Sequence, residues 1–230
     1  MSSRLSGLRG AILAGAVFSL VLAPAVSARA DQALDPRLAE VDSLLRQLEH
    51  TAAQYHNVPR QHGKFLRMLV EMTDSKSALE IGTANGYSAI WLGLGLEKTG
   101  GRLTTIEIVP EKADEARQNV KKAGLDDVVT CVTGDALKVI PRLKQTFDFV
   151  FIDAVKGDYW RYFELVRPRL RKGAVIAAHN AISARGAMGK YFDILESDPN
   201  LQTTVVAIEP RDGIAVTYVR RKPTAGKPGQ

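Results

Sequence analysis

The stretch that decides the fold is Ala78 to Ser88, with the sequence ALEIGTANGYS. Its first residues form a short apolar run, which predicts a buried strand, and Gly82 and Gly86 permit a tight turn because they carry no Cβ. A helix is predicted to begin near Tyr87, so that its first N–H groups point at whatever lies over the turn. Such a turn attracts anions and polar ligands, which indicates a nucleotide-binding turn. The G-x-x-x-G spacing alone also occurs in plain strand-to-helix connections.

Strands and helices alternate on both sides of this turn. Besides the strand at 78–81, the pattern predicts strands at 103–106, 128–132, 147–152 and 174–178, with helices at 87–95, 110–123, 136–143 and 158–170 between them. This alternation predicts a parallel sheet covered by helices on both faces. A helix at 187–196 and two strands at 203–208 and 214–219 follow. The last two strands are separated only by EPRDG, so the final strand is expected to run antiparallel to its neighbour.

The chain before the turn predicts two helices, over 35–56 and 61–72, whose apolar residues recur at helical spacing. We therefore expect N-terminal helices over 31–75, packed on a ligand-binding domain over 76–221, and a disordered tail over 222–230. At 230 residues the chain suits one α/β domain.

The first 30 residues have the plan of a secretory signal peptide. Arg4 and Arg9 precede an uncharged run that is closed by Pro24, and Ala28-Arg29-Ala30 forms a small-x-small cleavage site. The apolar core is short for a membrane span, so we expect cleavage after Ala30 and a periplasmic or secreted protein without a membrane span in the mature chain. The alternatives are a retained membrane anchor, or a cytoplasmic protein whose start has been placed too early.

Charge and cysteine content exclude several classes of protein. Residues 1–30 hold three of the 31 basic residues and no acids, so 28 basic and 25 acidic residues remain, a net charge of +3. No basic stripe with interleaved aromatics is present, which argues against nucleic-acid binding. Cys131 is the single cysteine, so an internal disulfide is impossible, and its apolar neighbours predict a buried thiol.

Polar residues follow each predicted strand: the Gly82 turn, Glu107, Asp135, Asp153 and His179-Asn180. Ligands of open α/β sheets bind at the carboxyl ends of the strands, so these residues are candidates for one site. Glu107 lies 21 residues beyond Gly86, where a carboxylate accepts ribose hydroxyls; the alternative is an exposed acid before Pro110. Asp135 is a candidate adenine contact, or else the cap of the helix that follows.

The chain from about Val58 to Val219 resembles the class I S-adenosylmethionine-dependent O-methyltransferases, in particular the caffeoyl-CoA and catechol O-methyltransferase branch. The matching pieces are VPRQHGKFL, LEIGTANGYSA, LTTIEIVPE, GDALKVIPRL, FDFVFIDAVKGDY and GAVIAAHNAI, in the family's order. The resemblance implies a Rossmann-like α/β fold with a seven-stranded, mostly parallel sheet whose last strand is antiparallel. It also implies a homodimer, and S-adenosylmethionine held by Val58, Glu80, Gly82, Thr83, Gly86, Ser88, Glu107, Asp135 and Ala136.

In the resembled family an Asp after strand four and an Asp-Asn pair after strand five hold a divalent ion, usually magnesium. Asp153 and Asn180 keep their places here, but His179 stands where the family has Asp, and Val155 replaces a second acid. Asp153, His179 and Asn180 are thus a candidate metal site, better suited to manganese, iron or zinc than to magnesium. In the rival interpretation no metal is used and His179 is a general base. Lys156 either steers the acceptor's charge or takes the proton, and a third possibility is that His179 is only a polar residue at a strand end.

The leading functional hypothesis is an O-methyltransferase acting on a small hydroxylated, aromatic, catechol-like acceptor, with Lys156, His179 and Asp153 as catalytic residues. One alternative is a NAD-dependent dehydrogenase, although Ala84 and Tyr87 break its G-x-G-x-x-G pattern. Another is an exported nucleoside-binding protein without transfer activity. His50, His56 and His62 are predicted to have surface roles. Export conflicts with a methyl donor that is made in the cytosol.

Overall fold

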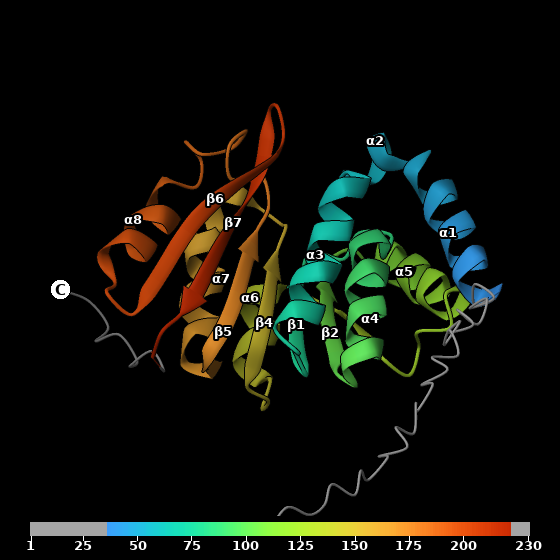
Figure 1. Ribbon diagram of the computed structural model, residues 1–230, viewed down its shortest axis with the longest axis horizontal. Coiled ribbons are helices and arrows are strands. Elements are labelled where there is room, and N and C mark those ends of the chain that lie inside the picture. Colours follow the sequence, from blue (N-terminus) through green and yellow to red (C-terminus); the bar gives the residue numbers. More distant parts are fainter. Residues whose placement is uncertain (1–35, 222–230) are drawn as a thin grey trace, which may run out of the picture. The chain divides into compact units, whose positions relative to one another are not determined.

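In the computed structural model, which describes residues 36–221, seven strands form one sheet in the order β3-β2-β1-β4-β5-β7-β6 (Figure 1). Their bounds are β1 Ser77–Ile81, β2 Arg102–Glu107, β3 Val129–Thr133, β4 Phe147–Ile152, β5 Leu170–Ala178, β6 Leu201–Glu209 and β7 Asp212–Val219. Strands β1 to β5 pair in parallel, and β7 is antiparallel to both β5 and β6, as predicted. The strand order reverses beside β1, which makes the carboxyl ends of β1 and β4 the expected place for a ligand. The predicted signal peptide and the predicted C-terminal tail lie outside the described residues.

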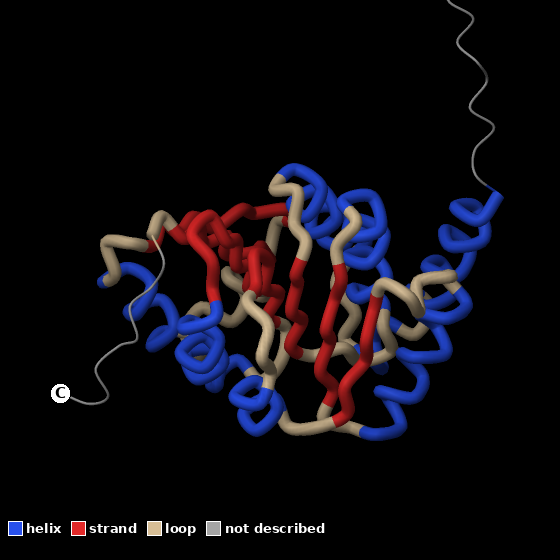
Figure 2. The backbone as a smooth tube through the Cα atoms, turned by 90° about the horizontal axis from the view of Figure 1, so that it is seen from below, coloured by secondary structure: helices blue, strands red, loops and turns tan. Residues whose placement is uncertain are grey.

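Helices cover both faces of the sheet (Figure 2). The α-helices are α1 Pro36–Glu49, α2 Ala52–Tyr55, α3 Arg60–Met72, α4 Tyr87–Thr99, α5 Pro110–Lys122, α6 Ala136–Val139, α7 Tyr159–Val166 and α8 Gly189–Ser197. Short 3₁₀ turns η1, η2 and η3 lie at Ile140–Arg142, Lys156–Asp158 and Arg167–Arg169. The buried side chains of α1, α3, α4 and α5 form one apolar cluster with the sheet, and those of α7 and α8 form a second. The two clusters correspond to the two faces expected of a doubly covered sheet.

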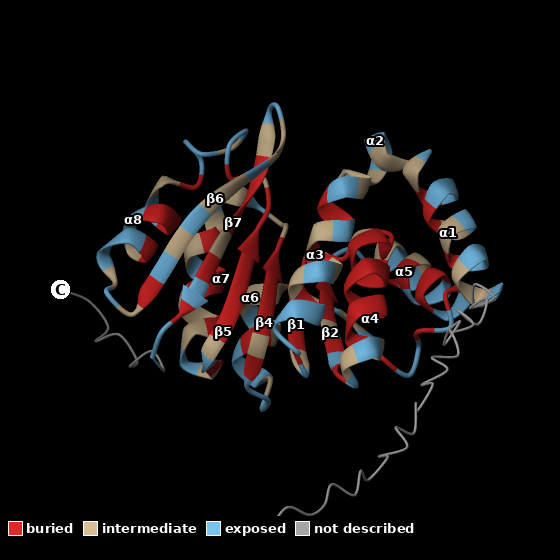
Figure 3. Cartoon of the chain, in the orientation of Figure 1, coloured by how far each residue is buried: buried red, intermediate tan, exposed pale blue. Residues whose placement is uncertain are grey.

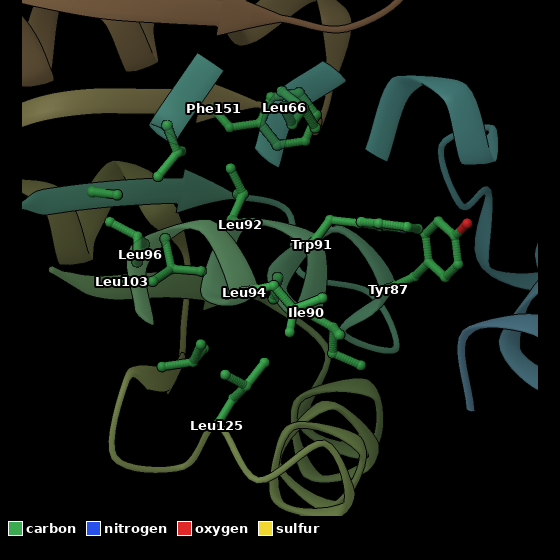
Figure 4. Close-up of a cluster of buried hydrophobic side chains, with 14 of the residues drawn as sticks. Leu66, Tyr87, Ile90, Trp91, Leu92, Leu94, Leu96, Leu103, Leu125 and Phe151 are labelled. Carbon is green, nitrogen blue, oxygen red and sulfur yellow. The ribbon is translucent and has the colours of Figure 1, made fainter. Parts of the chain in front are cut away.

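Helix α4 is the most deeply buried helix and follows directly on the glycine turn. Every residue from Tyr87 to Leu96 is buried (Figure 3) because α4 packs against the sheet at β2 and is flanked by α3 and α5. Its side chains pack against Leu66 of α3 and Leu103 of β2 (Figure 4). At its first turn the Tyr87 hydroxyl donates to Oε1 of Glu49 at 2.7 Å, which fastens α1 to the start of α4. A helix that is apolar on all sides is stable only in such a position.

Several predicted boundaries were wrong, and each has a local cause. The helix predicted over 35–56 is two helices. The N–H groups of His50 and Thr51 donate to carbonyls three residues earlier in the chain, and the Thr51 hydroxyl donates to the Leu48 carbonyl, so the α-helical pattern ends there. The helices predicted over 136–143 and 158–170 change to 3₁₀ turns at Pro141 and Pro168, since proline has no N–H to donate. Strand β5 begins four residues earlier than predicted.

The predicted loop EPRDG is also shorter than expected. Glu209 and Asp212 pair across the hairpin, so the connection is reduced to two residues and Asp212 belongs to a strand. Among residues 36–221 no helix is long and apolar enough to cross a membrane.

Candidate active site

The glycine turn joins the ends of three strands. Gly82 has φ +96°, and a Cβ on it would lie 2.1 Å from the carbonyl oxygen of Asp153, which follows β4. Its N–H donates to the carbonyl of Ile106 in β2 at 3.0 Å. Gly86, at φ +89°, would bring a Cβ within 3.2 Å of Ala116 in α5. Both positions therefore require glycine, both for the backbone angle and for the close approach.

A fully buried carboxyl group lies behind this turn. Oε2 of Glu80 accepts a hydrogen bond from the Thr105 hydroxyl at 2.6 Å, and the Thr105 hydroxyl also bonds the Thr83 hydroxyl. Burial raises the pKa of Glu80 to about 8, although hydrogen bonds from Ser88 and Thr105 oppose the shift. Glu80 thus supports the turn through the hydrogen bonds that link it to Thr105 and Thr83.

Glu107 is the last residue of β2 and lies on the wall of the site. Its Oε2 accepts the N–H of Ala84 at 2.8 Å, and its Oε1 accepts the N–H of Val109 at 3.0 Å. These two bonds fix the carboxylate against the turn, and only 8% of the residue is exposed. The alternative of a freely exposed acid was therefore wrong.

A cavity of about 710 Å³ opens at the carboxyl ends of the strands. Both interpretations of Asp135 apply to this structure, because it lines the cavity and also caps α6 by accepting the Leu137 N–H at 2.9 Å. Two predicted cofactor residues, Glu80 and Gly86, lie behind the wall rather than on it. The other predicted site residues line the cavity together: Val58, Gly82, Thr83, Ser88, Glu107, Asp135, Ala136, Asp153, Lys156, His179 and Asn180.

The three predicted catalytic residues meet at one end of this cavity. Nζ of Lys156 lies 2.7 Å from Oδ1 of Asp153 and also donates to the Tyr159 hydroxyl at 2.9 Å. Nδ1 of His179 lies 3.1 Å from Oδ2 of the same carboxylate. Burial alone would raise the pKa of Asp153, but His179 and Lys156 hold it below its ordinary value. Asp153 is therefore an anion with a partner on each oxygen.

Two further residues complete this cluster, and the sequence interpretation missed both. His62 of α3 was predicted to have a surface role, but it is fully buried, and its Nδ1 lies 2.9 Å from Nε2 of His179. The surface prediction agrees with the exposure of His50 and His56, although His56 also lines the cavity. Asp212 lies 3.6 Å from Nε2 of His179 and accepts the Asn180 amide at 2.6 Å.

The candidate metal ligands are therefore held by other side chains. Lys156 contacts Asp153, His62 contacts His179, and Asp212 contacts Asn180. In the described part of the chain, no three or more His, Cys, Asp or Glu side chains form a group that could hold a metal ion. A lysine ammonium on the carboxylate and an imidazole in place of the family's Asp also form a poor donor set for magnesium. The residues present do not fit the family's metal.

The fold and the site are those of a nucleoside-binding methyltransferase of class I. The features that indicate this class are the sheet order, the reversed last strand, the glycine turn after β1 and the acid at the end of β2. Residues 34–220 match the family model described as O-methyltransferase. The chain therefore belongs to this family of S-adenosylmethionine-dependent O-methyltransferases and is an enzyme. The dehydrogenase and the inactive binding protein are thereby set aside.

Curated relatives and solved structures agree with the family. A catechol O-methyltransferase of Niastella koreensis is 38% identical over 150 residues, covering 64% of this chain and 66% of the relative. Another from Mycobacterium tuberculosis is 36% identical over 178 residues, covering 71% and 80%. The Bacillus cereus O-methyltransferase in complex with S-adenosylhomocysteine superposes with a TM-score of 0.70 at 32% identity, covering 80% of this chain and 91% of that one. TomG of Streptomyces achromogenes, in complex with S-adenosylmethionine, gives 0.71 at 27% identity, with 77% and 90% covered.

Proposed function

We propose that the enzyme transfers a methyl group from S-adenosylmethionine to a phenolic hydroxyl of a small, catechol-like acceptor, and that it does so without a divalent ion. One observation carries the proposal: the Lys156–Asp153–His179 cluster lines the same cavity as the glycine turn and Glu107. Cofactor-binding residues and a buried charged cluster thus face one space. The names of the curated relatives support a catechol as the acceptor class.

The reaction needs an anionic oxygen more than it needs an activated donor. The phenolate oxygen forms a bond to the methyl carbon while the carbon–sulfur bond breaks, and the electron pair of that bond returns to sulfur. A free phenol has a pKa near 10, so a positive charge beside the oxygen is required at neutral pH. The ammonium group of Lys156 supplies that charge in our proposal, and the phenolic proton leaves to solvent before transfer.

His179 has a supporting role in this proposal rather than that of a general base. Its Nδ1 faces Asp153 and its Nε2 faces His62, so neither nitrogen is left for an acceptor hydroxyl. Asp153 in turn holds the Lys156 ammonium on its other oxygen. The imidazole therefore orients the carboxylate, and the carboxylate orients the lysine.

The proposal is tested with an acceptor panel. Chelator-treated protein is incubated with S-adenosylmethionine and catechol, phenol, benzyl alcohol or aniline, and products are identified by mass spectrometry. We expect O-methylation of catechol and none of benzyl alcohol, whose hydroxyl is far less acidic. Lys156→Met should abolish product, whereas the exposed Lys138→Met should not. Absence of any methylated phenol from protein that binds S-adenosylhomocysteine would contradict the proposal.

We also propose, from residues 1–30 alone, that the protein is exported and cleaved after Ala30. N-terminal sequencing of the native protein from fractionated cells tests this. A mature N-terminus at Asp31 in the periplasmic or secreted fraction is expected, and an intact Met1 in the cytosol would contradict it. The homodimer stays a prediction, which sedimentation of the purified protein would check.

A further inference from the structure

The buried histidine pair is a feature that the reaction described above does not use directly. His62 lies in α3 and His179 follows β5, 117 residues further along the chain, yet the two ring nitrogens are 2.9 Å apart. The rings meet edge to face, with centroids 5.0 Å apart and an interplanar angle of 86°. The exposed fractions are 0% for His62 and 4% for His179. Two buried imidazoles this close form a hydrogen bond between their ring nitrogens.

A carboxylate lies near each nitrogen of the His179 ring, Asp153 at 3.1 Å from Nδ1 and Asp212 at 3.6 Å from Nε2. Asp153 is ionised and can only accept, so the facing Nδ1 of His179 carries a hydrogen. Nε2 of His179 faces Nδ1 of His62 at 2.9 Å, so the two ring nitrogens share one hydrogen, and the tautomers set which nitrogen donates it. Burial, followed by the proximity of His179, lowers the pKa of His62. Among the described residues Nε2 of His62 has no hydrogen-bond partner, so this ring bonds through Nδ1, to His179.

His62 is itself held in place by close packing. A Cβ on the next residue, Gly63, would lie 2.3 Å from the Trp91 ring, so α3 approaches α4 as closely as a glycine allows. His62 therefore presents its Nδ1 from a rigid helix. Lys156, Asp153 and His179 line the cavity, but His62 does not. Any influence of His62 on a bound molecule must pass through His179.

We propose that His62 is a positioning residue for methyl transfer: the hydrogen bond between its Nδ1 and Nε2 of His179 holds the His179 ring so that this ring orients Asp153 and, through Asp153, the Lys156 ammonium. The line of contacts measures 2.9 Å from His62 to His179, 3.1 Å from His179 to Asp153 and 2.7 Å from Asp153 to Lys156. This proposal rests on the proposed function, because it assigns Lys156 the charge beside the acceptor oxygen.

Replacement of His62 by two different side chains tests the proposal. His62→Leu removes the hydrogen-bonding nitrogen, whereas His62→Asn places an amide group, which can donate or accept, where ring Nδ1 lies. We expect His62→Leu to lower kcat on catechol about tenfold, the rate equivalent of one lost hydrogen bond, with the KM for S-adenosylmethionine unchanged within about twofold. His62→Asn should recover kcat to within about threefold of wild type. The exposed His50→Leu is the matched control.

The outcomes separate this inference from the proposed function. Wild-type protein that methylates no phenol refutes the proposed function. Wild-type activity in His62→Leu, or equal loss in His62→Leu and His62→Asn when both bind S-adenosylhomocysteine normally, refutes only the role of His62. If His62→Leu does not fold, His62→Gln replaces it, since its longer side chain moves the amide to the position of ring Nε2. Activity in His62→Asn but not in His62→Gln then supports the inference, and equal activity in both overturns it.

Discussion

The buried carboxyl of Glu80 makes the stability of the fold depend on pH. It is fully buried beneath the cofactor turn, and burial raises its pKa from an ordinary 4.5 to about 8. Between these two values the unfolded chain has released the proton while the folded chain still holds it. The contribution of Glu80 to the free energy of unfolding must therefore fall as pH rises from about 4.5 to about 8.

The magnitude follows from the same two pKa values. Because one pKa unit equals 1.36 kcal/mol, the difference between 4.5 and about 8 corresponds to about 5 kcal/mol as an upper bound. Relaxation of the protein around a charged Glu80 reduces this difference, so we expect the measured free energy of unfolding to decrease by about 2 to 5 kcal/mol. In Glu80→Gln the side-chain amide oxygen can still accept the hydrogen bond from Thr105, but the side chain no longer titrates. This pH dependence should therefore disappear.

The assay is urea unfolding of wild type, Glu80→Gln and the exposed control Glu40→Gln at several pH values between 5 and 8.5. Wild type and Glu40→Gln should lose stability along parallel lines as pH rises, and Glu80→Gln should be flatter by about 1.4 kcal/mol per pH unit at most. Parallel lines for all three proteins would refute the argument that Glu80 is protonated in the folded enzyme.

Four other substitutions test stability, cofactor binding and chemistry in turn. Gly82→Ala should destabilise the protein by more than about 2 kcal/mol, because its Cβ meets a backbone oxygen. Gly100→Ala, where φ is also positive but nothing lies within 4 Å, should cost only about 1 kcal/mol in thermal unfolding. Glu107→Gln should weaken S-adenosylhomocysteine binding about tenfold in calorimetry, since the carboxylate holds Ala84 and Val109 in place. Lys156→Met should lower kcat at least about 100-fold with that binding unchanged; equal losses in binding and kcat would contradict its role.

The sheet could be predicted from the sequence because buried parallel strands and amphipathic helices have different periods. The short link between the last two strands also forced the correct antiparallel direction of β7. The residues at the strand ends could be predicted for the same reason, since the carboxyl ends of parallel strands converge. The sequence also contains the signals for the helix breaks at Pro141 and Pro168, although the predicted helices ran through both residues.

The contacts within the cluster could not be predicted in this way. His62 lies four residues before Leu66 and eight before Val70, which is the spacing of the buried face of α3, so a signal for its burial existed. Its partner, however, lies 117 residues away, and periodicity carries no information on such pairs. Asp212 was hidden because the hairpin is tighter than five connecting residues suggest.

The most direct test of the account is the rate of methyl transfer to catechol by metal-stripped protein, measured again after addition of magnesium, manganese or zinc. Because Lys156, His62 and Asp212 already contact the three candidate ligands, we predict full activity without metal and changes of less than about twofold on addition. A stripped enzyme that is inactive and recovers with magnesium or manganese would contradict the account.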